Sequence, residues 1–497
     1  RRQEEERGGK KHEERAVIRR PMNAQEMYRK MLAKQSQASD APPFKVSAPV
    51  LSIPDDTTLV VFGGTNWDNL GKGKEAHTKS APNLMGPCRL VLPGVKVTFV
   101  ATSSCSSHCI ALSASGAAYA WGRNQCGQLG LGDTLTRAGP TEVTALQGTP
   151  LSAAATGKHH TLWLGAEGDL FASGSSKEGC VGPSADKRRE MEATPVAVPG
   201  VAAGAAYVAA GGAHNLVIDR EGTLWAFGSS ECGVLGNGTD GQYNKSDSSI
   251  KLAYATEAAP LKVPKLAGRK MVLAACGPQH SAAVDEEGRC FTWGCGGYGR
   301  LGHKDQKDVW TPAELPGLRA TRVVCGSAFT AATGHAVLHS GVVCASSASL
   351  YMWGRVKSAS QNCWMSPTVE QELSGWKVQA LACGSVHTVV GADSSVISWG
   401  PACSCGELGY GELGPKSSAR PKKVDLLEGA HVAQVACGLA HTLLLAATDS
   451  AITDALPEWK PVQVTASGPS DAAGGAAAKG GAPKKTIAKK GGGKAKK

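Results

Sequence analysis

The stretch WGRNQCGQLGLGD, residues 121–133, decides the fold of this chain. An aromatic–glycine pair ends an apolar run, and a loop then leads into a compact turn at residues 127–130. Altered copies of this pattern recur along most of the 497 residues. A single hydrophobic core seldom reaches this length unless it belongs to a repeat array. The sequence therefore predicts a repeat protein, rich in strands and turns.

Two recurring marks set the register of the repeats. The first is a glycine at a strand end, and its seven copies are Gly63, Gly122, Gly174, Gly228, Gly294, Gly354 and Gly400. The second is Gly-x-x-His before an apolar strand, with His160, His214, His280, His387 and His441, and looser copies at Ser104–His108 and Gly326–Phe329. Strand, turn and strand lie between the marks, which predicts hairpins.

Units of four strands cannot bury their faces alone, and a ring of such units removes exposed sheet edges. The opening strand at 59–63 has no Gly-x-x-His strand before it, and the strand from His441 has no aromatic–glycine strand after it. Each supplies what the other lacks. We therefore expect an all-β, seven-bladed β-propeller over residues 51–458, closed by pairing of the N- and C-terminal strands.

Two intervals between repeats are long, around residues 239–264 and 334–348. Insertions in repeat arrays collect on faces and often bind partners. Tolerated length variation is the alternative, and we prefer it for 334–348.

The net charge of +11 lies in the two ends. Residues 1–50 carry +5 and residues 459–497 carry +8, so residues 51–458 carry −2. This distribution argues against a nucleic-acid-binding surface over the whole domain and for tails that contact an anionic partner. We expect a charged extension at 1–50 and a disordered Ala/Gly/Lys-rich tail at 459–497.

A short amphipathic helix is expected near residues 23–36, after a capping box formed by Asn23 and Glu26. One face would carry four large side chains, Met27, Tyr28, Met31 and Leu32. This helix either packs on its own propeller or docks a partner.

The last twenty residues are basic and of low complexity. Their lysines could contact nucleic acid, acidic microtubule tails or anionic lipid, and a merely solubilising tail is the alternative. The lysines concerned are Lys484, Lys485, Lys489, Lys490, Lys494, Lys496 and Lys497.

The repeats resemble the regulator of chromosome condensation superfamily, and one branch of it in particular, that of regulator of chromosome condensation 2. The stretches that carry the resemblance are FGGTNWDNLGKGK at 62–74, residues 121–133, WGCGGYGRLGH at 293–303, LSGWKVQALACG at 373–384 and WGPACSCGELGYGELGPKSS at 399–418. The second repeat departs from the pattern because Ser173 stands where the other repeats have an aromatic residue. The resemblance implies a seven-bladed propeller that associates with small GTPases, with nucleotide-exchange activity in some members, and with microtubules and chromosomes.

No enzyme, metal site or cofactor is expected. The run at Cys105–Cys109 lies at a strand start, where alternation places side chains on two faces, so core packing is favoured. The repeating histidines are interpreted as core residues bonded to backbone, each in a different blade. The pairs Cys403/Cys405 and Cys290/Cys295 lack a second pair at zinc-finger spacing. The 16 cysteines are interpreted as buried thiols that stay reduced.

Protein binding is expected where the repeats differ. The candidate residues are Asn66, Trp67, Asp68, Tyr243 and Tyr254. The favoured function is a non-catalytic small-GTPase regulator or adaptor on microtubules or chromosomes. The alternative is a constitutive structural subunit of a large cytoskeletal assembly, such as an axonemal microtubule, or of a ribonucleoprotein. The compartment would be the cytoplasm, cytoskeleton or nucleus. The first residue is Arg rather than Met, so a leader removed before it stays open as an alternative.

Overall fold

The computed structural model describes residues 44–47, 57–72, 81–183, 189–246, 250–337, 343, 348–356, 363–447 and 451–462. The chain divides into two compact units, residues 1–462 and 463–497, and the description below concerns the first. This unit extends past the boundary expected at residue 458, because the amide of Trp459 donates to the carbonyl of Arg89. No helix in the described ranges is long and apolar enough to cross a membrane.

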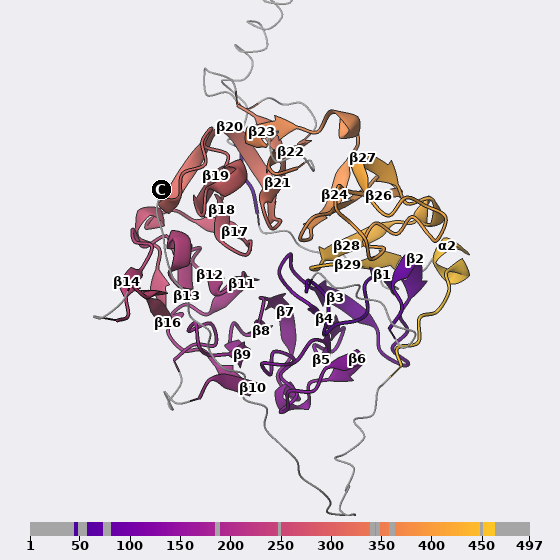
Figure 1. Ribbon diagram of the computed structural model, residues 1–497, viewed down its shortest axis with the longest axis horizontal. Helices are drawn as coiled ribbons and strands as arrows, with labels where there is room; N and C mark the ends of the chain where they lie inside the picture. Colours follow the sequence, from indigo (N-terminus) through magenta and orange to yellow (C-terminus); the bar gives the residue numbers. More distant parts are fainter. Residues whose placement is uncertain are drawn as a thin grey trace, which may run out of the picture. The chain divides into compact units, whose positions relative to one another are not determined.

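Seven blades of four antiparallel strands lie around a central channel (Figure 1), so the fold is a seven-bladed β-propeller. We call the strands of each blade a to d, from the channel outward. Blade 1 contains β3 (Val97–Ala101), β4 (His108–Ser113), β5 (Ala118–Gly122) and β6 (Arg137–Glu142). Blade 2 contains β7 (Leu151–Thr156), β8 (His160–Gly165), β9 (Leu170–Ser175) and β10 (Met191–Ala197). Blade 3 contains β11 (Ala205–Ala210), β12 (His214–Asp219), β13 (Leu224–Ser229) and β16 (Thr256–Lys262). Blades 4 and 5 share β20 (Val309–Cys325) and also contain β17 (Met271–Cys276), β18 (His280–Asp285) and β19 (Arg289–Gly294), then β21 (Phe329–Ala336), β22 (Ser349–Gly354) and β23 (Trp364–Val369). Blades 6 and 7 contain β24 (Val378–Cys383), β25 (Thr388–Ala392), β26 (Ser395–Gly400) and β27 (Ser418–Lys423), then β28 (Val432–Cys437), β29 (His441–Ala447), β1 (Thr57–Gly63) and β2 (Leu84–Arg89).

Blade 7 combines the two ends of the propeller sequence. Strand β1 pairs antiparallel with β29 over seven residues, from Thr57 opposite Ala447 to Gly63 opposite His441. The sheet order is therefore β2-β1-β29-β28. This is the pairing that the two incomplete terminal repeats indicated.

Both long intervals are partly ordinary blade structure, which corrects their expected limits. Strand β16 is the outer strand of blade 3, so the insertion there covers only residues 239–255 and forms a separate hairpin, β14 (Gln242–Asn244) and β15 (Leu252–Tyr254). In blade 5, β21 continues to Ala336 and takes up the start of the interval 334–348.

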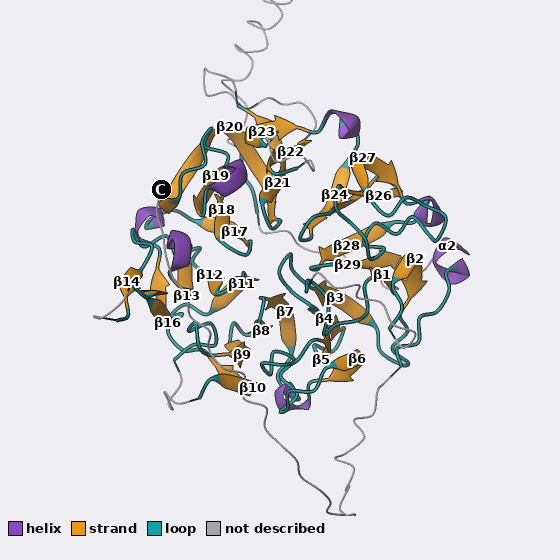
Figure 2. Cartoon of the chain, viewed as in Figure 1, coloured by secondary structure: helices purple, strands orange, loops and turns teal. Residues whose placement is uncertain are grey.

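Loops and short helices connect the strands of the blades (Figure 2), and the order of the strands places these connections on two different faces of the propeller. One face, which we call the loop face, carries the a–b turns and the long c–d loops, including η3 (Glu231–Gly233) and η5 (Gly297–Gly299). The other, the hairpin face, carries the b–c turns and the d–a connections, which contain η2 (Thr144–Leu146), η4 (Pro264–Leu266), η6 (Gln371–Leu373) and η7 (Asp425–Leu427). Helix α2 (Ala451–Ala455) follows β29.

The aromatic–glycine mark at each strand end has two physical causes. The aromatics are core residues, and the indole of Trp121 is fully buried. The glycine permits close strand contact, since Gly122 has φ +104° and a Cβ there would lie 2.6 Å from the Cα of His108. The second mark has a similar cause, because a Cβ at Gly157 would lie 2.1 Å from the imidazole of His160. Both glycines therefore make room for a histidine.

A short N-terminal segment, residues 44–47, contacts the hairpin face. The amide of Val46 donates to the carbonyl of Glu286, and the Phe44 ring meets the His335 ring edge-on at 5.4 Å between centroids. It belongs to the charged extension that the sequence predicts at residues 1–50.

Candidate functional site

The repeating histidines bond across blade boundaries. Nε2 of His108 in blade 1 lies 2.8 Å from the hydroxyl of Thr161 in blade 2, and that hydroxyl donates to the carbonyl of Gln128 back in blade 1. Since the hydroxyl has only one proton to donate, Nε2–H must be the donor to it. The side chain of one blade is thus held between two groups of the preceding blade.

The same arrangement recurs around the propeller. The other four copies are His160–Asn215–Cys180 carbonyl, His214–Ser281–Val234 carbonyl, His280–Thr330–Arg300 carbonyl and His387–Thr442–Glu407 carbonyl. Each histidine lies in a different blade, as the sequence indicated. The expectation that these rings bond to backbone was wrong, because their Nε2 partners are side chains of the next blade.

Two junctions depart from this pattern. Between blades 7 and 1, Nε2 of His441 lies 3.1 Å from both the Cys109 thiol and the Thr102 hydroxyl. Between blades 5 and 6, Phe329 occupies the histidine position, and the Thr388 hydroxyl lies 3.7 Å from the sulfur of Cys383 instead. The junction after blade 5 therefore lacks the histidine bond.

Burial keeps these imidazoles neutral. It lowers the pKa of His160 and His387 to about 4, and that of His214 and His441 to about 3. A neutral ring with Nε2–H bonded is a packing group rather than a proton donor at neutral pH. We therefore assign the histidines to the architecture and not to a reaction.

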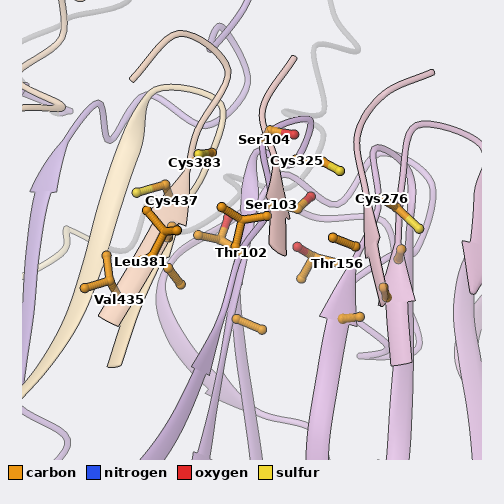
Figure 3. A pocket seen from close by; sticks show the side chains of 18 of the residues that line it. Thr102, Ser103, Ser104, Thr156, Cys276, Cys325, Leu381, Cys383, Val435 and Cys437 are labelled. Carbon is orange, nitrogen blue, oxygen red and sulfur yellow. The ribbon is translucent and has the colours of Figure 1, made fainter. Parts of the chain in front are cut away.

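The channel holds a cavity of about 220 Å³ lined by the a strands (Figure 3). Four thiols gather at one end of it, from Cys276, Cys325, Cys383 and Cys437. Burial raises the pKa of Cys383 to about 12 and that of the other three well above the usual range. Because metals and electrophiles react with the thiolate, these thiols are inert at neutral pH.

The loop at residues 66–70 lies between β1 and β2 of blade 7 and contacts blade 1. Arg123 donates to the carbonyls of Trp67, Asp68 and Leu70, at 3.0, 3.2 and 2.7 Å. The Trp67 indole donates to the Ala138 carbonyl and is only 3 % exposed. Trp67, expected at a partner surface, therefore packs inside the protein, whereas Asp68 is exposed and Asn66 is half-buried.

Exposed large apolar side chains concentrate on the loop face. Eleven occur among the described residues, and eight of them lie in c–d loops or at the start of a d strand: Leu135, Met191, Tyr243, Ile250, Leu252, Tyr298, Trp310 and Leu413. Solvated loops seldom keep so many apolar groups exposed unless they bind something. The loop face is therefore the candidate binding surface.

Two aromatic side chains of blade 4 stand out on this face. The Tyr298 ring contacts two guanidinium groups, with the Cζ of Arg355 4.6 Å and that of Arg300 5.8 Å from its centroid. Trp310 lies against the blade 3 loop, because a Cβ at Gly233 would come within 2.6 Å of its indole. Both side chains keep more than a third of their surface exposed.

The other residues singled out from the sequence are placed as follows. Tyr243 lies opposite Ala253 in the β14–β15 hairpin and is exposed, while Tyr254 lies opposite Gln242 and is half-buried. The structure thus brings both tyrosines onto one small hairpin of the loop face, far in sequence from Asn66 and Asp68. The four apolar residues of the 23–36 segment and all the C-terminal lysines lie outside the described residues.

The pattern of the sequence contained an unused signal for the inter-blade bonds. A small polar residue follows each histidine of the second mark except His108, which Cys109 follows, and Thr330 follows Phe329 at the equivalent place. These following residues lie within hydrogen-bond distance of the preceding blade's histidine, except Thr388, because the blade before it has Phe329 in place of a histidine. Trp310, Tyr298 and Leu413 were missed because single apolar residues in loops carry no periodic signal.

Comparison with known proteins shows the family to which this architecture belongs. The regulator of chromosome condensation (RCC1) repeat matches residues 115–164, 221–284, 287–333 and 393–445, and a second description of that repeat matches 99–128, 206–234 and 272–300. The chain is 34 % identical over 416 residues to the RCC2 homolog of Danio rerio, covering 79 % of this chain and 81 % of that protein.

Solved structures agree on the fold. Yeast RCC1 (Prp20), solved bound to Kap60, aligns with a TM-score of 0.63 and 19 % identity over 90 % of this chain and 98 % of that one. Prp20p of Saccharomyces cerevisiae, described with its binding to Gsp1p and histones, aligns with a TM-score of 0.60 and 19 % identity over 87 % and 97 %.

Proposed function

Because the chain belongs to the regulator of chromosome condensation superfamily and is similar to an RCC2 protein over 79 % of its length, we propose that it is a protein-binding propeller that regulates a small GTPase. The resemblance of the repeats implies association with small GTPases, and Prp20p, a relative in fold, is described as binding Gsp1p. We propose the same class of partner for this chain.

The observation that carries the proposal is the apolar character of the loop face. Eight exposed large apolar side chains lie there, whereas Val91 and Leu426 are the exposed ones on d–a connections. Aromatic side chains at the centre of an interface supply most of its binding free energy. Trp310 and Tyr298 are therefore the expected anchors, and Arg355 beside Tyr298 supplies a positive charge for an acidic partner surface.

A regulator of this kind needs no nucleophile. Contacts made more strongly with the nucleotide-free GTPase than with the loaded one would shift the equilibrium toward release. The loop face suits this role, because it presents rigid aromatic groups on a packed scaffold.

The basic C-terminal sequence supports a second contact. The lysines of residues 478–497 are suited to acidic microtubule tails or nucleic acid, through salt-dependent charge attraction. We propose that they place the propeller on microtubules or chromosomes. Adding salt should therefore weaken this attachment far more than it weakens binding at the loop face.

The test uses the full chain and a panel of purified small GTPases carrying a fluorescent nucleotide. Binding to at least one of them, with faster nucleotide release on addition of the propeller, is the expected result. Absence of both binding and faster release across the panel would overturn the GTPase proposal.

A further inference from the structure

Two thiols and a carboxylate from neighbouring blades converge on the loop face. Cys232 lies in the c–d loop of blade 3, while Cys295 and Asp308 lie at the two ends of the c–d loop of blade 4. One ligand atom of each, Sγ, Sγ and a carboxylate oxygen, lies within 4.8 Å of the other two. In the described part of the chain, this is the one group of three or more such residues whose ligand atoms lie so close together.

The backbone holds all three residues in place. Cys232 lies within η3 at φ +60°, a left-handed conformation that a cysteine adopts only where its surroundings impose it. The amide of Cys295 donates to the Gln279 carbonyl at 2.8 Å. Oδ1 of Asp308 accepts from the amide of Gly296 at 2.8 Å, which leaves the second oxygen of this carboxylate for another contact.

The equivalent junctions of other blades carry different partners. Arg123, which follows the strand-end glycine of blade 1, contacts the loop of blade 7, and Arg355 in blade 5 contacts Tyr298 in the loop of blade 4. Cys295 holds this position in blade 4 and meets Cys232 in the loop of blade 3. A repeated contact between adjacent loops has therefore become a pair of thiols here.

We propose that Cys232, Cys295 and Asp308 bind a zinc ion that links blades 3 and 4, with its fourth position open to water or to a partner side chain. Two cysteines and a carboxylate are ligands that Zn²⁺ accepts in tetrahedral sites. Tetrahedral Zn–S bonds of about 2.3 Å place two sulfurs about 3.8 Å apart, so at most about 1 Å of side-chain adjustment is needed.

Charge and access agree with a cation at this point. No lysine or arginine among the described residues forms an ion pair with Asp308, although Lys307 adjoins it in sequence. Two thiolates and a carboxylate at this spacing repel one another unless a cation lies between them. Asp308 is exposed and both cysteines are half-buried, so an ion can enter from solvent.

The channel thiols provide a contrast. Cys276, Cys325, Cys383 and Cys437 are buried, and no carboxylate joins them within ligand distance among the described residues. The blade 3–4 site differs from them in exposure and in its acidic third ligand.

The test is metal binding by the full chain after removal of metal with a chelator. Zn²⁺ titration by calorimetry should give one site per chain, and Co²⁺ should give the thiolate charge-transfer and tetrahedral absorption bands of a two-sulfur site. Cys295→Ser and Cys232→Ser should weaken Zn²⁺ binding more than about tenfold. Asp308→Asn keeps an oxygen for the Gly296 amide and should also weaken it, whereas Cys126→Ser, a half-buried thiol in the blade 1 loop, should not.

Three outcomes would overturn the proposal. The first is that the chain binds no zinc at micromolar Zn²⁺. The second is that wild type and Cys295→Ser bind Zn²⁺ with equal affinity. The third is a Cys232–Cys295 disulfide that persists under conditions that keep the other cysteines as thiols. Urea unfolding of each variant separates a lost ligand from a lost fold, because Asp308 is exposed and its replacement should leave stability unchanged without metal.

Discussion

Nε2 of His108 lies 2.8 Å from the hydroxyl of Thr161, although the two residues belong to different blades. The hydroxyl in turn donates a hydrogen bond to the Gln128 carbonyl, 2.7 Å away in the first blade. One threonine side chain therefore satisfies two buried polar groups of its neighbour. Repetition of this contact links blade to blade where strands do not pair.

Thr161→Val should destabilise the protein by about 1–3 kcal/mol, because it leaves the His108 N–H buried without a partner and removes the shorter of the two hydrogen bonds to the Gln128 carbonyl, the other coming from Ser173. The matched control is Thr388→Val, since Thr388 follows a blade with Phe329 in place of histidine and contacts only a cysteine sulfur. Urea unfolding should show a clearly smaller loss for the control. Equal losses would mean that the histidine bond contributes nothing.

Stability should fall in mild acid. The folded-state pKa of His160 and His387 is lowered to about 4 by burial, below the usual value of 6.5, so the unfolded chain takes up more protons in that range. The histidine contribution is complete above pH 6.5 and decreases from there down to about pH 4. At pH 5 each such histidine costs about 2 kcal/mol. Unfolding free energies measured from pH 8 to pH 4.5 check this, and His387→Phe should reduce the slope.

The seven-fold repeat was visible in the sequence because glycines and histidines recur at fixed places in the hairpin. The partner of each histidine was not, since Thr161 and Ser281 lie in the following repeat and only the three-dimensional arrangement brings them to the preceding ring. Trp67 was misplaced for a related reason. A tryptophan in a variable loop suggested a surface, but the clasp by Arg123 and the contact with His441 make it core.

Gly122→Ala should be severely destabilising, by more than about 2 kcal/mol, because the new Cβ would overlap the backbone of His108 at a left-handed φ. Gly148→Ala is the matched control, since Gly148 has φ +84° but nothing within 4 Å of an added Cβ. The control should cost about 1 kcal/mol, from backbone conformation alone. Thermal unfolding of both variants distinguishes the two contributions, and similar costs would contradict the packing explanation.

Arg123→Met should loosen the junction between blades 7 and 1. It removes three hydrogen bonds to the 67–70 loop while keeping much of the buried side-chain volume. Amide exchange at residues 66–72 should accelerate, while exchange in blades 3 to 5 should be unchanged. A uniform increase across all blades would instead indicate general destabilisation.

Binding through the loop face is tested most directly by the affinity of surface variants for a GTPase that the wild-type chain binds. Leu413 and Trp310 lie on the loop face and Leu426 on the hairpin face, all exposed, so Leu413→Asp, Trp310→Ala and Leu426→Asp are the informative set. At least one of the two loop-face variants should bind more than about tenfold more weakly. Leu426→Asp should bind like wild type. Full affinity in both loop-face variants, with a loss confined to Leu426→Asp, would contradict the assignment of the binding surface.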